Sequence, residues 1–198
     1  MAPMDSDPAA RVRRWLDEIV VGMNLCPFAA PVVRDGRVRI VVEESAEAER
    51  LFDRFTAEIE RLHAADPAEV ATTLIVAPDA PADFEEFHGL TGLFEDWLAN
   101  RGLDGDFQVV SFHPRFRFAD SGERDLAKFV NRAPHPLWHL LRQSDITAVT
   151  EESDAPMRRI VERNSELLDG MGPAGVRERY GAHLPEDALP RIPKPRRR

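Results

Sequence analysis

Short β-branched runs alternate with amphipathic helical patterns in the first half of the chain, and this alternation constrains the fold more than any other feature. Apolar residues recur at helical spacing between the runs, typical of helices that each bury one face. The pattern predicts an α/β fold: a small sheet of three or more strands, at least partly parallel, packed with amphipathic helices. An α+β arrangement gives the same pattern. The predicted strands cover residues 38–42, 72–76 and 107–112.

Helical spacing extends to both sides of these strands. It predicts a first helix over about residues 9–24, two helices between the strands, over about residues 51–62 and 81–98, and a short helix over about residues 136–143. A last helix is expected over about residues 156–168, closed by Gly170.

The domain boundaries follow from where this periodicity ends. We expect residues 1–8 to be disordered and residues 9–172 to form a single α/β domain. From Pro173 onward the Pro, Gly and Arg content rises. Residues 173–198 are therefore predicted to be a largely disordered extension with at most one short helix.

Charge and cysteine content restrict the partners and the compartment. The net charge is −9, and the basic residues near the C-terminus leave the remainder more acidic still. An acidic folded domain repels phosphate backbones, so we expect no nucleic-acid partner for it. The sequence has no run of the about 20 apolar residues needed to span a bilayer, so we expect no membrane partner either. A lone Cys26 cannot form an intrachain disulfide, which favours the reducing cytoplasm. Lys128 and Lys194 are the only lysines among 26 basic residues, a bias typical of GC-rich bacterial genomes.

Half of the six histidines fall within residues 113–139. His113 follows the third predicted strand, and ligands of α/β proteins usually bind beyond the carboxyl ends of strands. His135 and His139 are four residues apart, which places them on one face if the segment is helical, as in helical metal sites. Imidazole is both the commonest metal ligand and the usual proton shuttle near neutral pH.

Cys26 completes two alternative catalytic sets. In the first, Cys26, His113 and His139 bind a transition metal, and mixed sulfur and nitrogen ligands favour iron, zinc or copper; one histidine could instead be an axial ligand of haem. In the second, Cys26 is a nucleophile and one of the histidines is its base. The motifs of zinc fingers, metzincins, phosphate-binding loops and α/β-hydrolases are not present in the sequence.

Basic and amide side chains in the same region predict an anionic substrate. An extended backbone over residues 112–118 would direct His113, Arg115 and Arg117 to one face. Arg132 and Arg142 suit bidentate binding of a carboxylate, and Asn131 lies beside them. We therefore predict Arg115, Asn131, Arg132 and Arg142 as substrate-binding residues.

Two more polar residues have alternative interpretations. Asp120 either orients a histidine tautomer or belongs to a surface turn. Asn164 interrupts the apolar face of the last predicted helix, so it is either hydrogen-bonded in the core or directed at the site.

The chain carries five short motifs in order: Leu25-Cys26-Pro27-Phe28-Ala29, Phe112-His113-Pro114, Asn131-Arg132-x-Pro134-x-Pro136, His139-Leu140-Leu141-Arg142 and Arg163-Asn164. Together they resemble an uncharacterised bacterial family, domain of unknown function 1415. The resemblance covers about residues 10–170 and implies a site formed by Cys26, His113 and His139. Members of that family typically carry an aromatic residue where His135 stands, which makes His139 the stronger candidate.

Three functions remain open at this level. The first is a small cytoplasmic enzyme that uses a metal or haem, with redox or hydrolytic chemistry, on a carboxylate-bearing molecule. The second is a metal-independent transferase or hydrolase with a cysteine nucleophile. The third is a non-catalytic binding protein whose histidines and prolines build a rigid loop.

Overall fold

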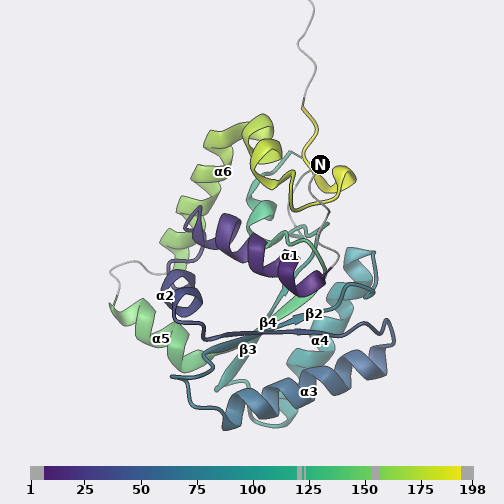
Figure 1. The fold of residues 1–198 in the computed structure, drawn as a ribbon, viewed down its shortest axis with the longest axis vertical. Coiled ribbons are helices and arrows are strands. Elements are labelled where there is room, and N and C mark those ends of the chain that lie inside the picture. Colours follow the sequence, from purple (N-terminus) through teal and green to yellow (C-terminus); the bar gives the residue numbers. More distant parts are fainter. Residues whose placement is uncertain (1–6, 120–121, 123, 153–156, 193–198) are drawn as a thin grey trace, which may run out of the picture.

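A four-stranded sheet in the order β1-β2-β4-β3 forms the centre of the protein (Figure 1). β1 is parallel to β2, whereas β4 is antiparallel to both β2 and β3. The strands are β1 (Val38–Val42), β2 (Thr72–Val76), β3 (Phe107–Phe112) and β4 (Leu137–Arg142). The computed structural model describes residues 7–119, 122, 124–152 and 157–192. The α/β prediction is confirmed, and the first three strands have the predicted bounds.

Helices cover both faces of this sheet. α3 and α4 lie on one side, and α1 and α6 lie on the other (Figure 1). The α-helices are α1 (Pro8–Trp15), α2 (Ala29–Arg34), α3 (Ala48–Ala64), α4 (Phe84–Asn100), α5 (Gln143–Glu152) and α6 (Met157–Tyr180). A π-helical segment η1 (Leu16–Val21) continues α1, and η2 (Ala127–Asn131) and η3 (Glu186–Ala188) are 3₁₀ turns.

Two separate apolar cores result, because successive side chains of a strand point to opposite faces. On the side that we call the α1 face, Leu74 and Leu137 pack with Trp15 of α1. On the opposite side, the α4 face, Ile75 and Trp138 pack with side chains of α3 and α4. Alternate residues of each strand therefore belong to different cores.

β4 corrects the predicted helix over residues 136–143. Leu137, Leu140 and Leu141 have helical spacing, but Leu137 faces the α1 side while Leu140 faces the α4 side. A strand flanked by two others and buried on both faces shows no alternation of polar and apolar residues, so its pattern resembles a buried helix.

The first helix also differs from the prediction. Asp7 caps it by accepting a hydrogen bond from the backbone nitrogen of Ala9 at 3.0 Å, and Pro8 stands in the first turn, where its missing N–H costs nothing. Regular α-helix ends at Trp15 and continues as η1, rather than running unbroken to residue 24.

The segment after Pro173 is packed, contrary to the predicted disordered extension. Val176 and Tyr180 are fully buried, and the Tyr180 hydroxyl donates to the carbonyl of Phe129 at 3.0 Å. Leu184 is buried as well. Proline is tolerated in the first turn of a helix, so Pro173 begins a second segment of α6 instead of ending the fold. Residues 1–6 and 193–198 lie outside the described residues.

No helix in the described part of the chain is both long enough and apolar enough to cross a membrane.

Candidate functional site

The loops after β2 and β3 meet the loop before β4 at one edge of the sheet. The backbone nitrogen of Ala77 donates to the carbonyl of Pro136 at 2.9 Å, and that of His113 donates to the carbonyl of Asn131 at 3.2 Å. Because β4 runs against β2 and β3, the carboxyl ends of those strands lie where β4 begins. Ligands of open α/β sheets usually bind at such an edge.

His113 is a structural anchor of this edge. Its ring packs on Phe84 and Phe87 of α4 and is 1% exposed. Nδ1 accepts the backbone N–H of Arg115 at 3.0 Å, which leaves Nε2–H to donate to the carbonyl of Pro81 at 3.3 Å. Burial lowers the pKa of His113 to about 4, so the ring is neutral at physiological pH. Both ring nitrogens are occupied by the protein itself.

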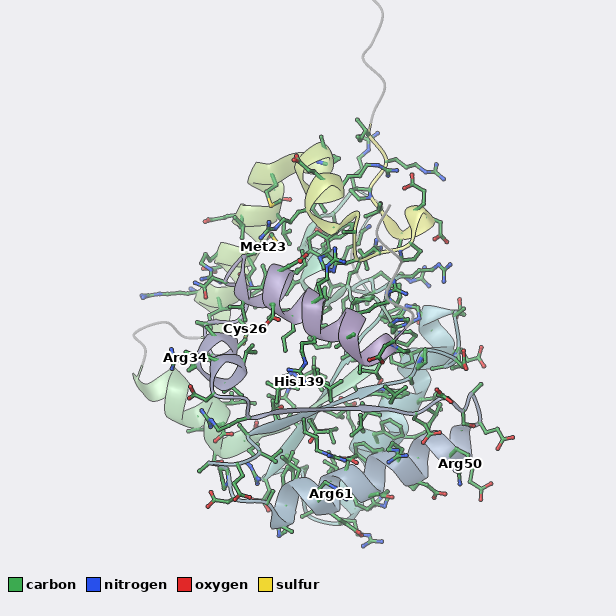
Figure 2. The ribbon with its side chains drawn as sticks, in the orientation of Figure 1. Met23, Cys26, Arg34, Arg50, Arg61 and His139 are labelled. Carbon is green, nitrogen blue, oxygen red and sulfur yellow. The ribbon has the colours of Figure 1, made fainter. Side chains whose placement is uncertain are left out.

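His139 lies on the other side of the sheet, on the α1 face (Figure 2). Thr72 Oγ1 donates its single proton to the carbonyl of Leu140 at 2.6 Å, so His139 Nε2–H donates to Thr72 Oγ1, also at 2.6 Å. Burial lowers the pKa of His139 to about 4. The residue is on a strand, so His135 and His139 do not form the predicted helical pair.

Cys26 lies between η1 and α2 and packs, half-buried, against the core of the α1 face. Burial raises the pKa of its thiol, although hydrogen bonds from the backbone nitrogens of Phe28 and Ala29 and the nearby charge of Arg163 oppose that shift. The thiol is therefore protonated at neutral pH, which is a poor state for a nucleophile.

The structure does not bring the predicted Cys26, His113 and His139 set together. His113 belongs to the α4 face, whereas Cys26 and His139 belong to the α1 face. Among the residues that the structure describes, no group of three or more His, Cys, Asp or Glu side chains is placed to hold a metal ion.

Of the two roles predicted for Asn164, the structure shows the first: the side chain is hydrogen-bonded in the core. Its Nδ2 donates to the carbonyl of Leu25 at 2.7 Å, and its Oδ1 accepts from Arg163 at 2.8 Å. Arg163 also donates to the carbonyl of Asn24, which has a left-handed φ of 52°. These bonds attach α6 to the bend that precedes Cys26.

Arg142 is a structural residue and not part of a site at this edge. It lies at the opposite end of β4, buried, and donates to the carbonyls of Leu62, Ala65 and Val70 around the C-terminus of α3. A cation there satisfies the last carbonyls of the helix.

Asn131 also has a structural contact. Its Nδ2 donates to the carbonyl of Ser111 at 3.3 Å, which joins η2 to β3. The chain turns at Pro114 and Arg115 instead of staying extended, so His113 faces the core while Arg115 and Arg117 face outward. Asp120 lies outside the described residues.

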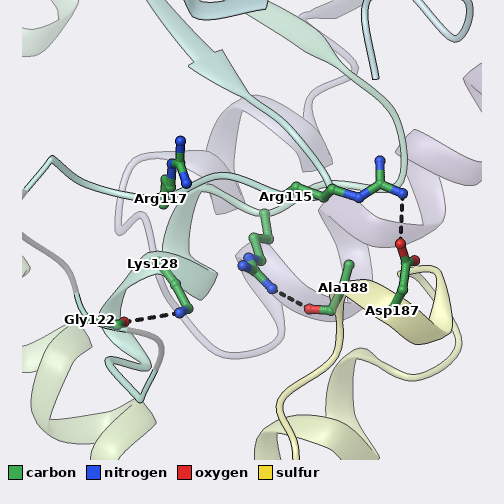
Figure 3. Close-up of a pocket in the computed structure, with 7 residues that line it drawn as sticks. Arg115, Arg117, Gly122, Lys128, Asp187 and Ala188 are labelled. Carbon is green, nitrogen blue, oxygen red and sulfur yellow. Dashed lines mark hydrogen bonds and ion pairs between the residues drawn. The ribbon is translucent and has the colours of Figure 1, made fainter. Parts of the chain in front are cut away.

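Arg115 and Arg132, by contrast, converge on a hollow of about 290 Å³ beside the loop after β3 (Figure 3). Its lining gathers cationic side chains in a chain whose net charge is −9. The lining residues are Arg115, Arg117, Gly122, Lys128, Arg132, Asp187 and Ala188.

Arg132 is the most deeply placed guanidinium of this hollow. It stacks over the ring of Phe129 at 4.4 Å, and it donates to the carbonyls of Phe116, at 3.2 Å, and Ala188. Burial, with the neighbouring charge of Arg115, lowers its pKa to about 10, so it remains charged at neutral pH. Within the described residues no carboxylate forms an ion pair with it.

The other two arginines are paired with exposed carboxylates. Arg115 contacts Asp187 at 2.7 Å (Figure 3). It also donates to the carbonyl of Ala82 at 3.2 Å. Arg117 contacts Glu85 at 2.8 Å. Guanidinium groups with free N–H positions form strong bidentate bonds to carboxylates and phosphates. The lining therefore offers several cationic donors to an anionic group.

Sequence reasoning missed Lys128, Asp187 and Ala188 as members of this hollow. Lys128 is a buried lysine in an arginine-rich chain, and that rarity was a usable signal. Asp187 and Ala188 lie in the segment expected to be disordered; the signal there was the apolar pair Leu184 and Leu189 on either side of a turn.

Comparisons with known proteins yielded no match among curated proteins or solved structures. A family model described as "Protein of unknown function (DUF1415)" matches residues 7–178. This range contains the four strands of the sheet and the cationic side chains of the hollow. The chain therefore belongs to this family of unknown function.

Proposed function

We propose that the protein binds a small molecule through its carboxylate or phosphate group, in the hollow lined by Arg115 and Arg132. The cationic lining, its position at the edge where β2 and β3 end, and its size support this assignment. A volume of about 290 Å³ suits a small metabolite rather than a polymer.

The observation that carries the proposal is the environment of Arg132. A half-buried guanidinium loses part of its hydration, and proteins normally compensate such a charge with a carboxylate. Arg132 has two backbone carbonyls and an aromatic ring instead, in the part of the chain that the structure describes. An incoming anion supplies the missing countercharge.

Recognition of an anion corresponds to one part of the function predicted from the sequence. Use of iron, zinc, copper or haem, and catalysis by Cys26 or a histidine, stay predictions. Binding is the activity that Arg115 and Arg132 themselves support, and it is common to an enzyme and to a non-catalytic binding protein.

Calorimetric titration with succinate and with inorganic phosphate, at constant ionic strength, tests the proposal. We expect saturable binding by at least one of them. Arg115→Gln should weaken it by about tenfold, because a charge-assisted bond is lost. Arg132→Lys should weaken it as well, because the charge stays but the planar fork is lost.

Arg34→Gln is the matched control, since it removes one charge from an exposed Arg34–Asp35 pair elsewhere on the molecule. It should leave binding unchanged. Equal loss of affinity in the control, or no binding of either anion by the native chain, would overturn the proposed function.

A further inference from the structure

The turn η3 places two oxygen acceptors against the cations of the hollow. Asp187 contacts Arg115 through its carboxylate at 2.7 Å, and the carbonyl of Ala188 accepts from Arg132. These are the same kinds of contact that the acid group of a ligand would make. Each guanidinium group thus already donates part of its N–H groups to the chain's own oxygens.

The backbone of this turn packs against the core, whereas the Asp187 side chain is exposed to solvent. Ala188 and Leu189 are buried, and Arg177 holds the segment by donating to the carbonyl of Pro190 at 3.2 Å. The Asp187 side chain is 61% exposed. Its carboxylate can therefore leave Arg115 by a change of rotamer while the turn stays docked.

The family match separates the two partners of this contact. It ends at residue 178, so Arg115 and Arg132 fall inside it and Asp187 falls outside. The cations belong to the matched region, and the occupying carboxylate belongs to the segment that follows.

We infer that Asp187 is a built-in competitor for the anion site: its carboxylate holds the place on Arg115 that the acid group of the ligand takes, and binding displaces it. The inference rests on the proposed function. It assigns Asp187 the role of limiting affinity, and it predicts that the ligand, like Asp187, presents an acid group to Arg115.

Asp187→Asn is the direct test, measured by calorimetric titration of the full-length chain with succinate and inorganic phosphate. The substitution keeps the shape but removes the charge that competes with the anion. We expect affinity to rise about fivefold, because the free energy of an exposed ion pair corresponds to a change in Kd of about that size.

Glu186→Gln is the matched control. Glu186 is the neighbouring acid on the same turn, pairs with Arg177, and does not line the hollow. It should leave affinity within about twofold of the native value, because it removes the same charge from the same turn. Circular dichroism of both variants should match the native spectrum, because both side chains are exposed.

The outcomes are distinguishable. Tighter binding by Asp187→Asn alone supports the inference. Unchanged or weaker binding by Asp187→Asn, with binding still weakened in Arg115→Gln, overturns the competitor role and leaves the anion site intact. An equal gain in both variants also overturns it, since the effect is then one of overall charge. No binding by any variant overturns the proposed function itself.

Discussion

His113 and His139 lie on opposite faces of the sheet, and the protein's own atoms fix the role of each ring. His113 follows β3 on the α4 face, and His139 sits in β4 on the α1 face. Each ring is held in one neutral tautomer by a fixed partner, Pro81 for the first and Thr72 for the second. Burial, rather than a neighbouring charge, is the main cause of their low pKa values.

At the same scale, the thiol of Cys26 should be unreactive. Burial raises its pKa, so little thiolate exists at neutral pH, and only the thiolate is alkylated. We expect iodoacetamide to modify Cys26 more slowly than it modifies the same protein unfolded in guanidinium chloride, as followed by mass spectrometry. Faster modification of the folded protein would instead restore the proposed cysteine nucleophile.

Single residues of the site were only partly predictable from the sequence. Arg115 and Arg132 were identified because basic side chains near a strand end attract anions, and that reasoning needs no tertiary detail. Arg142 has the same chemistry but lies at the far end of β4, beside α3. Its role depended on knowing that residues 137–142 form a strand.

At the scale of elements, β1, β2 and β3 were predictable because each is a β-branched run between turn residues. β4 was not, since it carries His139 and Arg142, is covered on both faces, and pairs with strands that come earlier in the chain. Long-range pairing leaves no local signal. α6 was predicted to end at Gly170, but the helix continues to a bend at Gly172.

Because of the bend in α6, the same Gly→Ala substitution should change the free energy of unfolding in opposite directions at two positions. Gly172 has φ 63° and ψ 176°, a backbone conformation that is essentially restricted to glycine and costs an alanine about 1–3 kcal/mol. Gly170 is in the helical part, with no neighbouring atom within 4 Å of an added Cβ. Gly172→Ala should lower the free energy of unfolding by about that amount, and Gly170→Ala should raise it by about 0.4–1 kcal/mol.

Urea unfolding followed by circular dichroism measures both changes. Loss of stability in Gly170→Ala, or a gain in Gly172→Ala, would contradict the bend at this position.

At the scale of the whole molecule, neutral histidines that are largely removed from water couple stability to pH. The pKa values of His113, His135 and His139 are each lowered to about 4 in the folded state, chiefly by burial. An unfolded chain has ordinary values near 6.5. As the pH falls from about 6.5 towards about 4, the unfolded chain binds protons that the folded chain does not, so stability is lost over that window.

We expect the free energy of unfolding to be constant near neutral pH and to fall below about pH 6.5 by up to about 1.4 kcal/mol per pH unit for each of these histidines. Urea unfolding between about pH 7 and about pH 5 measures this slope. His113→Gln should reduce the slope, whatever it does to the stability at neutral pH. A flat profile would show that the imidazoles are not buried as described.

The position of β4 in the sheet also bears on how the polypeptide is made. Among the strands of the described residues, β4 is the last to leave the ribosome, yet it is the one that pairs with β3 and it separates β3 from β2. During translation β3 therefore emerges before the strand that it must pair with, and its hydrogen-bonding groups stay open on both edges. Closure of the sheet waits for residues 137–142, and until then the open edges of β3 can pair with another chain.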